Sequence, residues 1–231
     1  MIEPTLTQLA NHFGSDKGTI HGDRHNYTAV YDLIFHRFKF SPIHFLEIGL
    51  ARGGPENPGV SRTAASQSPS VAMWMHYFPL ATIYGFDITD FSAIENPRFR
   101  FIHGDASNSA DLAKLAAAAP RYHLIVDDGS HASPHQQLTF KHLFPRLAPG
   151  GIYVIEDLHW QSPVFEALIP GTPKTAEAFA ALYERGVYLP NPILSEAELA
   201  AAKEETAVYS MLPGLNGAPS GAKLLILQKK M

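Results

Sequence analysis

Two short acidic segments carry the residues of this sequence that are best suited to chemistry. The first is Asp127-Asp128-Gly129-Ser130-His131, and the second, one helix and one strand later, is Glu156-Asp157-Leu158-His159. Each segment follows a short apolar run, which predicts that each lies at the end of a buried strand. If the two strands are neighbours in a parallel sheet, Asp128 and the Glu156/Asp157 pair converge at one edge of that sheet.

Three crowded carboxylates need a balancing charge, because they otherwise repel one another and resist ionisation. The sequence contains no cysteine, which excludes disulfides, a thiolate nucleophile and Cys-ligated zinc or iron–sulfur sites. Oxygen ligands suit a hard divalent cation such as Mg²⁺, Mn²⁺ or Ca²⁺. We therefore predict a metal site formed by Asp128, Glu156 and Asp157.

His131 follows Asp128 by three residues, close enough to face the same site. A neutral imidazole there can accept a proton from a metal-bound hydroxyl. Purely structural interpretations stay open. A single histidine is more often a surface or core residue than a catalytic one, and Asp127 can simply cap a helix that begins near Ser130. His159 is a second histidine beside the predicted site.

Acidic residues also follow the earlier strands. Glu47 and Gly49 lie near the end of the first predicted strand, and Asp87 and Asp105 end the second and third. Glycine lets the backbone approach a ligand closely. At these strand ends, Asp87 can accept hydrogen bonds from both ribose hydroxyls of a nucleoside, and Asp105 is placed to meet an adenine amino group. We therefore predict a nucleoside-containing cofactor.

The glycine loop after the first strand argues against a dinucleotide. Its sequence is GLARGG, with a Gly-Gly pair at residues 53–54, and it does not match the G-x-G-x-x-G phosphate-binding pattern. A nucleotide-dependent oxidoreductase on a similar sheet remains the main alternative. A non-catalytic metal- or ligand-binding domain of the same fold is the other.

The elements that must position these residues alternate between strands and helices from residue 43 onward, which is typical of βαβ units and a mainly parallel sheet. Residues 1–40 form a helical N-terminal segment, with helices over 5–13 and 28–38. Ser109 is the expected N-cap of its helix, and the Pro-Gly-Gly at 149–151 is expected to stop the helix before it. The predicted strands span 43–50, 81–88, 98–105, 122–128, 151–158, 206–212 and 222–230, and the predicted helices span 71–78, 109–119, 133–147, 175–186 and 195–205.

The bulk properties are those of one globular enzyme domain. The chain has 231 residues, of which 45% are hydrophobic and 17% charged, and this length fits a single α/β domain. The net charge of −4 gives no electrostatic reason to expect nucleic acid or an anionic membrane as partner. The sequence shows no signal peptide and no apolar run near the roughly 20 residues of a membrane-spanning helix. We expect a cytoplasmic enzyme that acts on a small molecule.

The sequence resembles a known family, the metal-dependent sugar O-methyltransferases of antibiotic biosynthesis, which include mycinamicin, macrocin and rhamnosyl O-methyltransferases. The resemblance covers roughly residues 12–160. It is carried by DDGSH, LFPRLAPGG and IYVIEDLHW, by HFGSDKG and HNYTAVYDLIF in the N-terminal segment, and by LEIGLARGG, SVAMWMHYFP and IYGFDITD in the cofactor half. Other proteins with this signature are described as hydroxylases, so the chemistry is not fixed by the motifs alone.

The resemblance implies a Rossmann-like class I methyltransferase fold, with a seven-stranded, mostly parallel sheet and helices on both faces. It implies one domain over residues 1–231, made of the N-terminal substrate-side segment 1–40 and a core at 43–231. It also implies S-adenosylmethionine and Mg²⁺ as cofactors, a glycosylated natural product as acceptor, and leaves a homo-oligomer open. Carried over residue by residue, it makes His131 the general base, Asp128, Glu156 and Asp157 the metal ligands, and Glu47, Gly49, Ser70, Asp87, Asp105 and Asp128 the cofactor-binding residues. The chain departs from the family in its long, Pro-rich loop at 55–69, which leaves the identity of the acceptor open.

Overall fold

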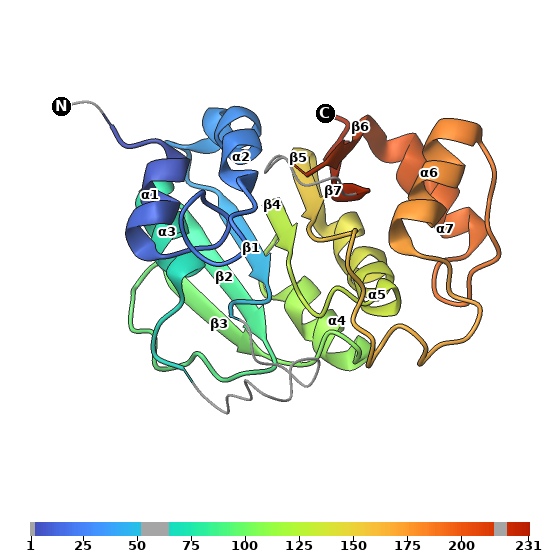
Figure 1. Cartoon of the computed structure of the whole chain (residues 1–231), viewed down its shortest axis with the longest axis horizontal. Helices are drawn as coiled ribbons and strands as arrows, with labels where there is room; N and C mark the ends of the chain where they lie inside the picture. The colour runs from blue at the N-terminus through green and yellow to red at the C-terminus, as the bar shows by residue number, and fades with distance from the viewer. Residues whose placement is uncertain (1–2, 52–64, 215–220) are drawn as a thin grey trace.

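A single seven-stranded sheet forms the centre of the structure, a computed structural model that describes residues 3–51, 65–214 and 221–231 (Figure 1). The strand order is β3-β2-β1-β4-β5-β7-β6. The first five of these strands pair in parallel, and β7 is antiparallel to both of its neighbours. This is the sheet of a class I methyltransferase, so the predicted fold is confirmed. The strands are β1 (His44–Ile48), β2 (Thr82–Asp87), β3 (Phe99–His103), β4 (Tyr122–Asp127), β5 (Leu147–Ile155), β6 (Thr206–Pro213) and β7 (Ala222–Lys229).

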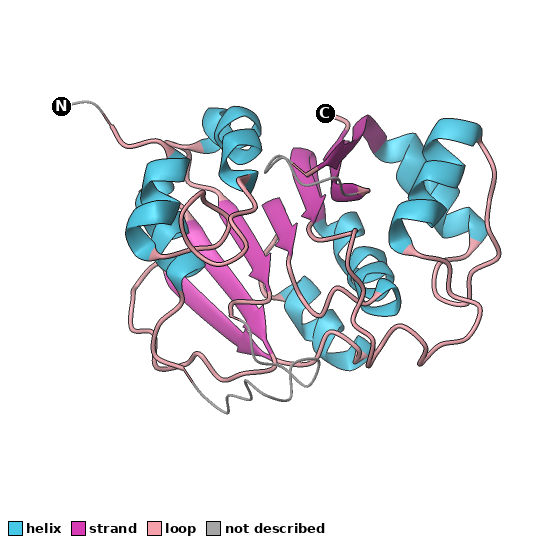
Figure 2. Ribbon diagram, viewed as in Figure 1, coloured by secondary structure: helices cyan, strands magenta, loops and turns pink. Residues whose placement is uncertain are grey.

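Helices cover both faces of the sheet, as predicted (Figure 2). One buried apolar cluster joins the sheet to α1, α2 and α3, and a second joins it to α4, α5, α6 and α7. Short 3₁₀ turns follow α2 at His36–Phe38 and α5 at Phe144–Arg146. The helices are α1 (Leu6–Phe13), α2 (Tyr27–Phe35), α3 (Pro69–Tyr77), α4 (Ser109–Ala117), α5 (Ser133–Leu143), α6 (Thr175–Arg185) and α7 (Glu196–Glu205).

Successive residues of each strand enter opposite clusters, because side chains alternate across a pleated sheet. In β4, Leu124 and Val126 pack on the side of α1–α3, whereas Ile125 packs on the side of α4–α7. The same alternation places Val154 of β5 toward α1–α3 and Ile155 toward α4–α7. This parity decides which helices the acidic residues at the strand ends can meet.

Two details of the predicted elements are wrong. The N-cap of α4 is Asn108, whose side chain accepts a hydrogen bond from the amide of Ala110 at 2.9 Å, and Ser109 is the first helical residue. Helix α5 ends at Leu143, before Pro145, whose ring cannot continue the hydrogen-bond ladder. The Pro-Gly-Gly at 149–151 therefore lies inside β5 and does not stop the helix.

The remaining predicted elements occur in the predicted order. The Gly-Gly pair at 53–54 and most of the Pro-rich loop at 55–69 lie outside the described residues. Within the described ranges, no helix has the length and apolar character that crossing a bilayer requires.

Candidate active site

The ends of three neighbouring strands bring the acidic residues together. Residue Ile48 of β1 pairs with Asp127 of β4, and Asp127 pairs with Ile155 of β5. Asp128 and Glu156 therefore follow aligned positions at the same edge of the sheet, as the two sequence segments predicted. They also point to the same side, since Lys17, which precedes α2, contacts both carboxylates.

Asp127 takes the opposite orientation and has a structural environment. Its carboxylate accepts a hydrogen bond from the Thr139 hydroxyl of α5 and lies 3.4 Å from the Tyr153 hydroxyl. It is 2% exposed, and burial raises its pKa to about 6. Asp127 is therefore a residue of the α4–α7 side, and α5 begins at Ser133, beyond its reach as an N-cap.

A buried ammonium group lies among the carboxylates of the α1–α3 side. The Nζ atom of Lys17 donates to Asp128 Oδ2, donates to Glu156 Oε2 at 2.8 Å, and lies 3.8 Å from Glu47 Oε1. Burial opposes the charge on Lys17, but the three carboxylates outweigh that effect, and the pKa of Lys17 is raised well above its ordinary value. Lys17 thus supplies the balancing positive charge that the crowded carboxylates require.

Helix α2 contributes two phenol groups to the same cluster. The Tyr31 hydroxyl donates to Glu156 Oε1 at 2.6 Å, and the Tyr27 hydroxyl donates to Asp157. Burial and the adjacent carboxylates raise the pKa of both tyrosines, so both remain neutral donors. The helical N-terminal segment, predicted to lie on the acceptor side, therefore also contacts the predicted metal ligands.

Asp128, His131 and Asp157 form a compact group. One potential ligand atom of each lies within 4.8 Å of the others. His131 Nε2 is 4.0 Å from Asp128 Oδ1 and 4.0 Å from Asp157 Oδ2. Its Nδ1 atom is buried without a hydrogen-bond partner, and its ring meets the Trp160 ring edge-on at 5.4 Å.

The carboxylates of the cluster respond differently to their surroundings. Burial raises the pKa of Asp128 and raises that of Glu156 well above its ordinary value, although Lys17 opposes both shifts. Burial alone would raise the pKa of Asp157 too, but the neighbouring His131 and His25 hold it below its ordinary value. Burial raises the pKa of Glu47 to about 7.

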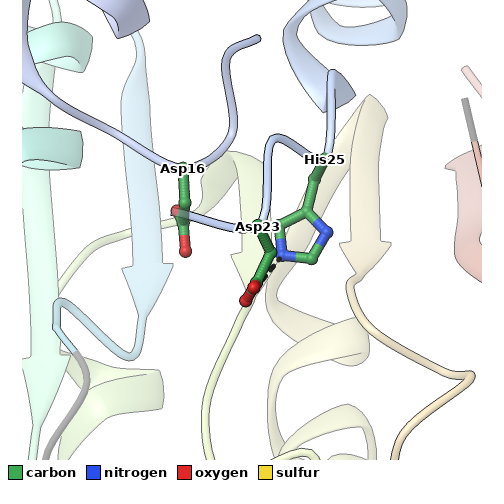
Figure 3. A group of neighbouring side chains, drawn as sticks. All are labelled: Asp16, Asp23 and His25. Carbon is green, nitrogen blue, oxygen red and sulfur yellow. Dashed lines mark ion pairs between the residues drawn. The ribbon is translucent and has the colours of Figure 1, made fainter. Parts of the chain in front are cut away.

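His25 also approaches Asp157, from the loop between α1 and α2. His25 Nε2 lies 3.7 Å from Asp157 Oδ2 and 3.9 Å from Asp23 Oδ2, and the His25 ring stacks on that of Tyr27 at 4.7 Å. Asp16, Asp23 and His25 form a further group of potential ligand atoms on this loop (Figure 3). His159 also approaches Asp157, with its Nδ1 atom 3.8 Å from Oδ1.

Two cavities meet at this cluster. The larger, about 1120 Å³, is lined by Lys17, Ser70, Asp128, His131 and Asp157 among others. The smaller is lined by Asp87, Asp105, Phe86 and His135 among others. Gly49, Ala51, Asp128 and Gly129 line both cavities, so the two cavities are adjacent.

Of the residues predicted for the cofactor, all but Glu47 line one or both of these cavities. The Asp87 carboxylate accepts hydrogen bonds from the amides of Leu50 and Thr89, each at 2.7 Å, which hold it at the cavity wall. Ser70 lines the larger cavity and donates to Glu47 Oε2 at 2.8 Å. Glu47 itself is fully buried and lies behind Ser70.

The arrangement fits the groups that the sequence predicts. A nucleoside fits the smaller cavity, where two strand-end carboxylates supply acceptors for hydroxyl and amino groups. A hard divalent cation fits Asp128 and Asp157, whose carboxylates lie beside Nε2 of His131. Glu156 differs from the other two predicted metal ligands, because both of its carboxylate oxygens accept hydrogen bonds from the N-terminal segment.

Lys17, Tyr27 and Tyr31 were not identified from the sequence. All three lie within the N-terminal motifs HFGSDKG and HNYTAVYDLIF, so the resemblance pointed to the segment but not to these side chains. A lysine inside a motif that is otherwise polar and Gly-containing is the one local signal that could have drawn attention to Lys17.

Comparison with known proteins places this chain in a family, although no family model matches it. The 8-demethyl-8-alpha-L-rhamnosyl tetracenomycin-C 2'-O-methyltransferase of Streptomyces olivaceus is 38% identical over 179 residues, which are 76% of this chain and 44% of that protein. The mycinamicin VI 2''-O-methyltransferase of Micromonospora griseorubida is 35% identical over 156 residues, 68% of this chain and 36% of that protein. The chain thus spans less than half the length of these curated relatives.

A solved structure gives the same relationship. The MycE methyltransferase of the mycinamycin pathway, in complex with Mg and SAH, aligns with a TM-score of 0.72 and 25% identity over 99% of this chain and 55% of that one. The same protein has been solved with Mg, SAH and mycinamycin VI, and that structure aligns with a TM-score of 0.70. The chain belongs to the sugar O-methyltransferase family of these proteins.

Proposed function

We propose that this protein is an S-adenosylmethionine- and Mg²⁺-dependent O-methyltransferase that methylates a hydroxyl group of a sugar on a glycosylated natural product. The observation that carries the proposal is the group of Asp128, His131 and Asp157 where the two cavities meet. The relatives named above act on rhamnosyl and mycinamicin substrates. The polar larger cavity gives a sugar hydroxyl access to this group.

The smaller cavity is assigned to the adenosine part of the cofactor. Asp87 would accept hydrogen bonds from the ribose hydroxyls, and Asp105, which lines the same cavity, would accept one from the adenine amino group. Gly49 and Ser70, which line the larger cavity, would hold the remainder of the cofactor. Asp128, Glu156 and Asp157 are assigned to the divalent cation.

When bound, the cofactor supplies a methyl group on a sulfonium, and the cation supplies positive charge that lowers the free energy of deprotonating the acceptor hydroxyl. His131 accepts that proton on Nε2, the atom that faces Asp128 and Asp157. The two carboxylates stabilise the imidazolium that results. The cavity walls would restrain the acceptor and the cofactor relative to each other, and such restraint removes much of the entropic cost of a reaction.

The test is methyl transfer from labelled S-adenosylmethionine to a panel of glycosylated macrolides and polyketides, with simple catechols as non-sugar acceptors. We expect transfer to a glycosylated acceptor with Mg²⁺, no transfer after treatment with EDTA, and recovery on adding Mg²⁺ back. Asp128→Asn should lose activity because a neutral amide is a poorer ligand for a hard cation. Full activity after exhaustive chelation would exclude the metal from the reaction.

A further inference from the structure

We propose that Lys17 is a positioning residue, whose ammonium group, anchored on Glu156, holds Asp128 in the orientation in which it binds the divalent cation. The proposal rests on the metal-dependent function above. It concerns a lysine from the N-terminal segment, 111 residues before Asp128 and 139 before Glu156.

The two oxygens of Asp128 have different partners. Oδ2 accepts from Lys17, whereas Oδ1 faces His131 Nε2 at 4.0 Å, within the group that includes Asp157. A donor fixed to one oxygen prevents the carboxylate from rotating and keeps the other oxygen directed into the group. Hydrogen bonds of this kind commonly set the geometry of carboxylate ligands.

Lys17 is itself held rigidly. Its residue is 1% exposed, and the backbone on either side is pinned by hydrogen bonds from His25 N to Asp16 O at 3.0 Å and from Thr28 N to Lys17 O at 3.1 Å. The ammonium reaches carboxylates that follow or belong to three adjacent strands, β1, β4 and β5. Lys17 therefore links the ends of these three strands through one rigidly held side chain.

Two effects of the ammonium oppose each other. Its charge repels a cation, while its hydrogen bonds preorganise the ligands. Three acidic groups, those of Glu47, Asp128 and Glu156, face the single ammonium, and Asp157 adds a fourth nearby. A divalent cation therefore still meets more acidic groups than basic ones, and the orientation of its ligands becomes the deciding factor.

The experiment measures Mn²⁺ binding to the purified protein by calorimetry and by electron paramagnetic resonance, without acceptor or turnover. We expect Lys17→Met to bind Mn²⁺ about 10–100-fold more weakly than wild type, the usual cost of losing a partner of a metal ligand. Binding of adenosine, which lacks the part of the cofactor assigned to the larger cavity, should remain, because the smaller cavity does not include Lys17. A merely structural role for Lys17 would weaken both.

Lys39→Met is the matched control, since Lys39 is also largely buried but pairs with Glu3 at 3.0 Å, in the N-terminal segment. It should bind Mn²⁺ as wild type does. If Lys17→Met does not fold because three buried carboxylates lose their cation, the double variant Lys17→Met/Glu47→Gln removes one negative charge as well and is measured for Mn²⁺ in its place.

Mn²⁺ affinity equal to or tighter than wild type in the folded variant would overturn the proposal, because it would show that the ammonium only competes with the metal. If wild type itself bound no Mn²⁺, the proposed metal-dependent function would fail, and that outcome is separate from any effect of Lys17.

Discussion

At the residue scale, two backbone conformations direct His131 and Asp157 toward each other. His131 has φ of 59° and Asp157 has φ of 54°, and neither is glycine. The left-handed region costs a non-glycine residue roughly 1–2 kcal/mol, and such conformations often occur at functional sites. The two residues lie in the segments that follow β4 and β5, and His131 Nε2 is 4.0 Å from Asp157 Oδ2.

Replacing His131 with alanine tests its role as general base. We expect kcat to fall by about 10²–10⁴-fold, the range for a positioned proton acceptor, with little change in the binding of Mn²⁺ or S-adenosylhomocysteine. The wild-type rate should also fall at low pH, because a protonated imidazole cannot accept the proton. The measurement is the pH–rate profile under single-turnover conditions.

His76→Ala is the control for His131→Ala, since His76 is exposed on α3 and hydrogen-bonds within its own helix. A near-normal rate in His131→Ala would show that His131 is not the general base. Loss of Mn²⁺ binding would instead make it a metal ligand, and His159, 3.8 Å from Asp157, would become the next candidate base.

At the element scale, the loop after β1 must cross the loop after β4 at very short range. Gly49 has φ of 80°, and a Cβ atom added there would lie 2.0 Å from the backbone oxygen of Asp128. The amide of Asp128 also donates to Ile48 O at 2.8 Å. This crossing sets both the junction of the two cavities and the position of Asp128.

Gly49→Ala should therefore be severely destabilising. The left-handed backbone and the clash together should lower the free energy of unfolding by roughly 2–5 kcal/mol, as measured by urea denaturation. Gly171→Ala is the matched control, because Gly171 has φ of 82° with no heavy atom within 4 Å of the added Cβ. In Gly171→Ala the free energy of unfolding should fall only by the backbone cost, about 1–2 kcal/mol. Equal falls in the two variants would show that the clash does not contribute to the loss of stability in Gly49→Ala.

At the scale of the whole molecule, the connected cavities should give ligand-dependent stability. A ligand at about 100 times its Kd adds about 2.7 kcal/mol to the free energy of unfolding, which is roughly 5–10 °C in Tm for a chain of this size. We expect S-adenosylhomocysteine to produce this shift and NAD to produce none, as measured by differential scanning fluorimetry.

Asp87→Ala should reduce the shift by S-adenosylhomocysteine, since hydrogen bonds to a charged group contribute roughly 1.5–3 kcal/mol each. A shift with NAD alone would favour the oxidoreductase alternative. A full shift without any methyl transfer to the acceptor panel would favour a non-catalytic binding domain.

The sequence by itself determined the sheet and the edge at which chemistry occurs. Alternating strands and helices specify a doubly wound sheet, and the acidic residues that end its strands must then gather at one edge. The residues within reach of the strand ends were therefore predictable from local pattern.

Only the tertiary structure decided what those carboxylates contact. Lys17, Tyr27 and Tyr31 lie more than a hundred residues before their acidic partners, and no periodicity in the sequence encodes a contact across that separation. Their positions depend on how α1 and α2 pack against the sheet, which is decided by the shape of the buried cluster on that side. For the same reason the structure, and not the sequence, shows that Glu156 is held on both oxygens while Asp128 presents one to His131.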